Sequence, residues 1–189
     1  LAGADKTRVL LAALLLSPHI PLLFMGEEFG ETHPFLFFTD FHGELAKAVR
    51  EGRAKEFTGH AGQDETVPDP NDVNTFIRSK LDWNKIATDE GKTWLRYTRH
   101  LLTLRHRYIV PLLHPGGAVE GHVLKTAPGM VAVSWRFPSG TLSLALNIGT
   151  KPVDLPALAG ETRFAWPEVN DVLPPNGIVV RFADGEASL

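Results

Sequence analysis

The spacing of apolar residues divides the chain into a first part with helical periodicity and a second part in which apolar and polar residues alternate. Asp5 to Leu16 is dominated by Ala and Leu and predicts a buried helix, with an acidic residue at the positive end of its dipole. Ser17-Pro18 ends this helix, because the residue before a proline is pushed out of the helical region. Pro21 to Met25 is apolar on both faces and predicts a central strand of a parallel sheet. Helix, turn and buried strand in this order indicate an α/β fold.

Amphipathic spacing and turn residues organise the middle of the chain. A short amphipathic helix is expected to end near Glu56, and Thr58 to Asn74 is rich in Gly, Pro, Asp and Asn, which predicts a long loop. Thr88 to His106 predicts the clearest amphipathic helix, which should end at Ile109-Val110-Pro111. The sequence His114-Pro115-Gly116-Gly117 marks the best candidate for a domain boundary.

Beyond this boundary the apolar period changes to two. Met130 to Phe137, a turn at Pro138-Ser139-Gly140, and Thr141 to Ile148 predict a β-hairpin. Further short strands are expected at Thr162 to Trp166 and at Ile178 to Phe182. The second part is therefore predicted to be an antiparallel sandwich of roughly six or seven short strands.

Composition narrows the kind of protein and its surroundings. The chain has 189 residues, a formal net charge of −3 and no cysteine. No basic stripe with interleaved aromatic residues occurs, so we expect no nucleic-acid partner. The longest apolar run, Val9 to Leu16, is too short to span a bilayer, so no membrane partner is expected either. The lack of cysteine excludes disulfides and fits a reducing, cytoplasmic location. Because the chain opens at Leu1 rather than Met and soon enters an apolar helix, we expect a segment of a longer protein.

The first candidate for chemistry is the acidic sequence Gly26-Glu27-Glu28-Phe29-Gly30-Glu31, which follows the predicted strand. In parallel α/β folds ligands bind where strands end, so acids at this place suggest a site. A catalytic pair is disfavoured, because neighbouring side chains on an extended segment point to opposite faces, whereas a retaining glycosidase needs two carboxyls about 5–5.5 Å apart. We expect one glutamate to face the site and the other to pair with a cation.

The second candidate is the aromatic sequence Pro34-Phe35-Leu36-Phe37-Phe38. Phenyl rings on a loop can stack on the apolar faces of sugars, but they can equally form a hydrophobic plug that pins the loop to a barrel. The histidines have no metal-ligand spacing, and the aspartates of residues 64–72 lack the pattern of a calcium-binding loop. We therefore expect no metal and no cofactor.

The sequence around these candidates resembles a known family. Ser17 to Gly30 is similar to the last barrel strand of the alpha-amylase family, and Glu31 to Asp40 resembles the continuation found in maltooligosyltrehalose trehalohydrolases. Further segments with the same resemblance are Glu44-Leu45, Val49 to Arg53, Glu56-Phe57, Val67 to Pro70, Thr75-Phe76 and Ser79 to Trp83.

The resemblance implies a fold and a division of the chain. Residues 1–112 would supply the last strand and helices of a catalytic TIM (β/α)8 barrel, and residues 113–189 an antiparallel β-sandwich C-terminal domain. The implied partners are the remainder of the barrel and a maltooligosaccharide or trehalose-type substrate. The residues implied to shape its subsites are Glu27, Glu28, Phe29, Pro34, Phe35, Phe37, Phe38 and Asp40.

The implied activity is hydrolysis of the α-1,4 bond next to the terminal trehalose unit of maltooligosyltrehalose. The family's retaining mechanism needs an aspartate nucleophile, a glutamic acid/base and a second aspartate on earlier barrel strands. Neither an Asn-His-Asp nor a Gly-x-Arg-x-Asp segment occurs here, so no catalytic residue is assigned and the chain alone should be inactive. The alternatives are another alpha-amylase-family enzyme, such as a branching or debranching enzyme, and a non-catalytic carbohydrate-binding or structural module.

Overall fold

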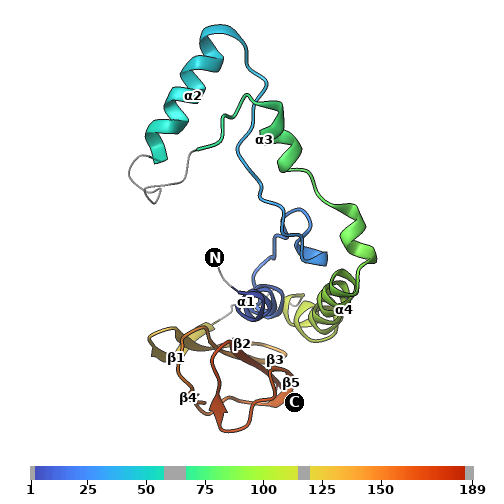
Figure 1. Cartoon of the computed structure of the whole chain (residues 1–189). Helices are drawn as coiled ribbons and strands as arrows, with labels where there is room; N and C mark the ends of the chain where they lie inside the picture. Colours follow the sequence, from blue (N-terminus) through green and yellow to red (C-terminus); the bar gives the residue numbers. More distant parts are fainter. Residues whose placement is uncertain (1–2, 58–66, 115–119, 186–189) are drawn as a thin grey trace. The chain divides into compact units, whose positions relative to one another are not determined.

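The computed structural model describes residues 3–57, 67–114 and 120–185 (Figure 1). The chain forms two compact units, one made of Leu1–Leu22 with Arg96–Leu189 and the other of Leu23–Leu95. The first unit contains the sheet, and the second contains the residues predicted to bind a substrate.

The sheet unit begins with helix α1 (Ala4–Leu16) and resumes in the second half of α4 (Asp89–Leu104). A π-helical turn, η3 (Arg105–Ile109), and helix α5 (Val110–Leu113) follow without a break. The strands of the main sheet are β1 (Glu120–Ala127), β2 (Met130–Phe137), β3 (Gly140–Asn147), β5 (Glu161–Trp166) and β7 (Gly177–Asp184). They are antiparallel and have the order β1-β2-β3-β7-β5. The short strands β4 (Val153–Asp154) and β6 (Val172–Leu173) pair separately.

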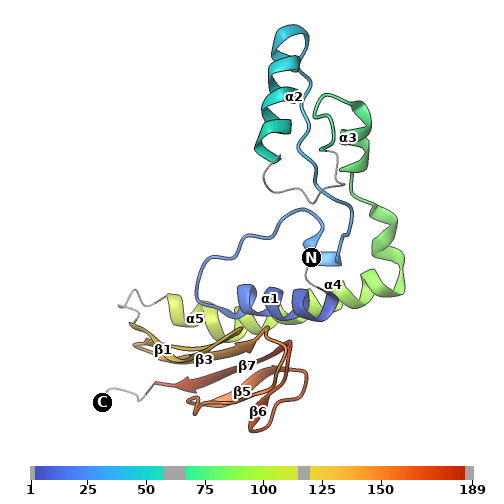
Figure 2. The same ribbon diagram turned by 60° about the vertical axis from the view of Figure 1, so that its left-hand side comes forward.

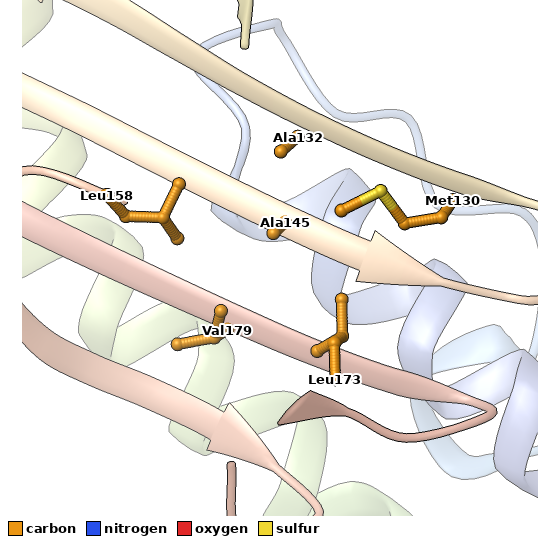
Figure 3. Close-up of a cluster of buried hydrophobic side chains, with 6 residues drawn as sticks. All are labelled: Met130, Ala132, Ala145, Leu158, Leu173 and Val179. Carbon is orange, nitrogen blue, oxygen red and sulfur yellow. The ribbon is translucent and has the colours of Figure 1, made fainter. Parts of the chain in front are cut away.

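Both faces of the central strands are buried. On one face the sheet packs against α1 and the chain from residue 96 to 113, as Figure 2 shows. The ring of Tyr97 lies 6.2 Å from that of Phe164, and Tyr108 lies 5.7 Å from Phe182. The opposite face carries the cluster drawn in Figure 3, in which Leu173 of β6 packs against residues of the main sheet. Apolar residues that alternate along β3 therefore contribute to two separate cores.

Arg105 ties the π-helical turn to the end of α1. Its guanidinium donates hydrogen bonds to the carbonyl oxygens of Leu15 (2.9 Å), Ser17 (2.7 Å) and His19 (2.8 Å). The residue is buried, and burial lowers the pKa of its side chain. The last carbonyls of a helix lack partners within the helix and carry partial negative charge, so a buried cation is stabilised there.

The second unit consists of short helices and irregular chain. Its elements are η1 (Glu27–Phe29), α2 (Gly43–Phe57), α3 (Val73–Arg78), η2 (Trp83–Ala87) and the first residues of α4. Helix α3 begins where Asp72 accepts a hydrogen bond from the backbone N–H of Asn74, a side-chain cap of the usual kind. It begins at the end of the stretch predicted as a loop, Thr58 to Asn74, whose residues 58–66 fall outside the described part.

Most predicted elements are confirmed. The first helix, the amphipathic helices, the hairpin of β2 and β3, and the strands β5 and β7 all occur where the sequence indicates them. Seven antiparallel strands are described, but the layer facing the main sheet is only the β4–β6 pair, and helices cover the other face. Strand β1 was not predicted, because it is an exposed edge strand with little apolar alternation. The predicted domain boundary at 114–117 falls largely on residues outside the described part.

Two predictions are wrong for this chain. Pro21 to Met25 is not a strand, and Leu22 is 84% exposed. The physical reason is that a strand needs hydrogen-bonding neighbours, and within the described ranges no segment pairs with it. The helix predicted to end at Pro111 continues to Leu113, because the preceding π-helical turn η3 already interrupts the i→i−4 hydrogen bonds that a proline would break.

Candidate functional site

A tight turn carries the candidate acids. Gly26 has a left-handed conformation (φ 81°), and its carbonyl oxygen accepts hydrogen bonds from the backbone N–H groups of Phe29 (3.2 Å) and Glu31 (2.9 Å). A Cβ at Gly26 would come within 2.5 Å of the Cβ of Glu31. Only glycine fits both the conformation and the space.

The two glutamates lie on this turn. The prediction that they lie on an extended segment, which disfavoured a catalytic pair, is wrong. Gly26 reverses the chain at once, and Glu27 bends back so that its Oε2 accepts the N–H of Phe24 at 2.8 Å. Glu27 is exposed and Glu28 is half-buried. Within the described residues neither makes an ion pair, so the expected pairing of one glutamate with a cation is not observed.

Phe29 and Trp94 hold the turn from the inside. Phe29 is only 1% exposed, and its ring lies 5.8 Å from that of Trp83. The indole of Trp94 donates a hydrogen bond to the carbonyl oxygen of Glu27 and also lies against Gly30. Phe29 therefore packs within the unit, whereas Glu27 and Glu28 remain accessible.

Glu31, which ends the acidic candidate sequence but was not among the residues implied to shape the subsites, is the most constrained carboxylate of the described chain. Its side chain is 4% exposed. Burial by itself would raise its pKa, but hydrogen bonds from the backbone N–H groups of His33, Asp82 and Thr32, and from the His33 ring, outweigh burial and lower the pKa to about 2. No local pattern reveals this role, because Asp82 lies 51 residues away in the sequence.

The aromatic loop, residues 32–40, contains two kinds of ring environment. Phe35 lies 4.9 Å from Phe24 and 5.9 Å from Phe38, which in turn lies 5.2 Å from Phe76, with edge-on geometry throughout. Phe37 is separate and lies 5.0 Å from the guanidinium carbon of Arg53 on α2. Phe35 and Phe37 are about half exposed, so the loop combines a packed row of rings with accessible faces.

Polar contacts hold the backbone of this loop. The N–H of Leu36 donates to Ser79 Oγ at 3.0 Å, and the N–H of Thr39 donates to the carbonyl oxygen of Pro70 at 2.7 Å. Asn71 Oδ1 accepts the hydroxyl of Thr39 at 2.9 Å. Pro34 and Asp40, the remaining predicted site residues, are exposed at the two ends of the aromatic run.

Among the described residues, no group of three or more His, Asp or Glu side chains is placed to hold a metal ion. None of the helices within residues 3–57, 67–114 and 120–185 has the length and apolar character that crossing a bilayer requires.

Known proteins resemble this chain over most of its length. Malto-oligosyltrehalose trehalohydrolase of Deinococcus radiodurans is 49% identical over 104 residues, and that of Brevibacterium helvolum is 37% identical over 158 residues, or 82% of this chain. The chain spans 17% and 26% of the length of these two relatives. It matches their C-terminal part. No protein-family model matches the chain.

Solved structures agree with these relatives. A Salmonella typhimurium protein provisionally described as an alpha amylase is 63% identical, with a TM-score of 0.89 over 97% of this chain and 31% of that protein. An isomaltulose synthase of Erwinia rhapontici has a TM-score of 0.59 at 16% identity, which concerns the fold alone. The solved structures that resemble the chain are alpha-amylase family proteins, which have a TIM barrel and a C-terminal domain. The chain itself is similar to the C-terminal part of the maltooligosyltrehalose trehalohydrolases, as the motifs of residues 17–83 indicate.

Proposed function

We propose that the chain is part of a glycoside hydrolase that cleaves the α-1,4-glucosidic bond next to the terminal trehalose unit of maltooligosyltrehalose and releases trehalose. The observation that carries this proposal is the similarity to the named trehalohydrolases, at 37% identity over 82% of the chain for the relative from Brevibacterium helvolum. The whole protein's activity is proposed from these relatives, because the chain spans about a quarter of that relative's length.

The proposed role of this chain is to bind substrate and not to supply the reacting acids. Glu27 and Glu28 are accessible on a rigid turn, and Phe35 and Phe37 present ring faces on the adjoining aromatic loop. Carboxylates can accept hydrogen bonds from sugar hydroxyls, and aromatic faces can stack on sugar rings. In this proposal Phe29 and Phe38 pack beneath the accessible residues and support them. Pro34 and Asp40 lie at the two ends of the aromatic run.

We further propose the arrangement of the whole protein. Pro21 to Met25 becomes the last strand of a TIM (β/α)8 barrel when its neighbouring strands are present, which accounts for the exposure of Leu22 and the half-exposure of Phe24 and Met25 here. Residues 1–112 then belong to the barrel and residues 113–189 to a C-terminal β-sandwich domain. The cytoplasmic location stays a prediction.

An assay of two proteins tests the function. The chain alone and the longer protein that contains it are incubated with maltooligosyltrehalose, and released trehalose is measured by chromatography. We expect trehalose from the longer protein and none from the chain alone. Linear and branched glucans without the trehalose unit serve as control substrates, because a branching enzyme would act on the linear ones and a debranching enzyme on the branched ones. Trehalose released by the chain alone would show that it contains the catalytic acids.

A further inference from the structure

We propose that Glu31 is the positioning residue of the aromatic loop: its carboxylate fixes residues 32–40, and therefore the ring faces of Phe35 and Phe37, in the orientation that binds the sugar. This inference rests on the proposed function for the identity of the substrate. It assigns to Glu31 a role distinct from contact with the sugar, because its side chain is almost fully buried.

The two carboxylate oxygens of Glu31 accept hydrogen bonds from different segments of the chain. Oε1 accepts the backbone N–H groups of Thr32 (2.6 Å) and His33 (2.9 Å) and lies 3.0 Å from the Nδ1 of the same histidine. Oε2 accepts the backbone N–H of Asp82 at 2.6 Å. One side chain thus shapes the first residues of the aromatic loop and joins them to the residue that begins η2.

Glu31 is also part of the turn that carries the candidate acids. Its backbone N–H closes the turn on the carbonyl oxygen of Gly26, and its Cβ fills the space beside that glycine. Glu31 therefore fixes the position of two groups of candidate residues. These are Glu27 and Glu28 on the turn, and Phe35 and Phe37 on the aromatic loop. Hydrogen bonds to an ionised carboxylate are short and strong, so the position of the Glu31 carboxylate resists displacement.

A second and weaker contact also joins the aromatic loop to η2. Lys85 of η2 donates from Nζ to the hydroxyl of Thr32 at 3.2 Å, but this contact is exposed to solvent. Solvent-exposed polar contacts of flexible side chains contribute little. The shorter and partly buried bond between Glu31 and Asp82 is accordingly the contact whose loss should release the loop.

Substitution with glutamine separates these contributions. In Glu31→Gln the amide oxygen can still accept from Thr32 and His33, but the amide NH2 group cannot accept the N–H of Asp82. Glu31→Asp keeps both oxygens and the charge but is one methylene shorter, so it cannot reach both partners together. Glu51→Gln, an exposed glutamate on α2, is the matched control.

The experiment uses the longer protein that contains this chain. The kcat and KM for maltooligosyltrehalose are measured for wild type and the three variants, at a temperature where circular dichroism shows each to be folded. Hydrogen exchange of the peptides covering residues 31–36 and 80–84 is measured on the same samples. Glu31→Asp provides the comparison if Glu31→Gln does not fold.

We expect KM to rise about tenfold in Glu31→Gln, equivalent to about 1.4 kcal/mol, because binding lost equally from substrate and transition state raises KM. We expect kcat to change less than about twofold, together with faster exchange at both peptides, an intermediate KM for Glu31→Asp and no change for Glu51→Gln. Unchanged KM with faster exchange, or a fall in kcat at constant KM, would overturn the positioning role. A wild-type protein that releases no trehalose would instead refute the proposed function, and with it the role of Glu31 in binding that substrate.

Discussion

The indole Nε1 of Trp94 donates a hydrogen bond of 2.7 Å to the backbone carbonyl oxygen of Glu27. The same ring occupies the space beside Gly30, where an added Cβ would lie 2.9 Å from it. One side chain near the start of α4 therefore holds both ends of the turn that carries Glu27 and Glu28. The position of the candidate acids depends on a helix that is distant in the sequence.

Replacing Trp94 with phenylalanine removes this hydrogen bond while keeping an aromatic ring. We expect Trp94→Phe to lower the free energy of unfolding by about 1 kcal/mol, the usual net value of a hydrogen bond, with an added loss from the smaller ring. Hydrogen exchange of residues 26–31 should become faster. Trp135→Phe, in the sheet unit, is the control and should leave exchange in this turn unchanged. Equal protection of the turn in both variants would contradict the importance of the Trp94 bond.

Gly26 and Gly52 offer a matched pair of substitutions. Gly26→Ala places a side chain on a left-handed residue and against Glu31, so we expect a loss of at least about 1–2 kcal/mol in the free energy of unfolding. Gly52→Ala, on α2 with open space around the new Cβ, should raise it by about 0.5–1 kcal/mol, because alanine favours a helix. Denaturant unfolding of both variants measures the difference. If both substitutions changed the free energy of unfolding in the same direction, the explanation from backbone conformation and space would be ruled out.

Arg105 and Arg107 are neighbours with different surroundings. Arg105→Met leaves three carbonyl oxygens at the end of α1 without their donor, and we expect the free energy of unfolding to fall by about 2–3 kcal/mol. Arg107 is exposed and lies 5.2 Å from the Tyr108 ring, so Arg107→Met should cost about 0.5–1 kcal/mol. Thermal unfolding monitored by circular dichroism compares them. Similar midpoints would mean that the α1 carbonyls find other donors.

The lowered pKa of Glu31 predicts an acid dependence of stability. A carboxylate whose folded pKa is below its unfolded value stabilises the fold above the unfolded pKa, and this stabilisation is lost as the pH falls through the folded pKa. For Glu31 the window runs from 4.5 down to about 2. At neutral pH the contribution is at most about 3 kcal/mol, from about 1.4 kcal/mol per pKa unit, and solvent around the exposed hydrogen bonds of Oε1 reduces it.

Urea unfolding of wild type and Glu31→Gln across this range tests the dependence. The difference in unfolding free energy between the two proteins should be largest above pH 5 and should shrink towards pH 2. A difference that stays constant over the whole range would show that Glu31 does not change its protonation there on unfolding.

A substitution at Leu22 should have different effects in the chain alone and in the longer protein. Its side chain is 84% exposed here, and exposed apolar patches promote association. We expect Leu22→Lys to reduce aggregation of the isolated chain, as measured by light scattering. In the longer protein the same change should prevent folding, because the proposed barrel strand would bury the lysine without a partner. Improved or unchanged folding in both contexts would argue against that strand.

The sequence alone predicted what depends on local pattern. The helical period of residues 5–16 and the alternation of residues 130–148 each report a buried face, and α1 and the hairpin of β2 and β3 follow from them. The motifs of residues 17–83 indicated the resemblance to the maltooligosyltrehalose trehalohydrolases, which the chain's relatives confirm.

Tertiary structure decided what depends on partners far apart in the chain. Pro21 to Met25 has the composition of a buried strand, but a ladder forms only where a neighbour supplies donors and acceptors. Glu31 looks like any loop glutamate until the N–H of Asp82 reaches its carboxylate. Apolar period is a local property that a sequence displays, whereas satisfying a backbone carbonyl or a buried charge requires groups that only folding brings together.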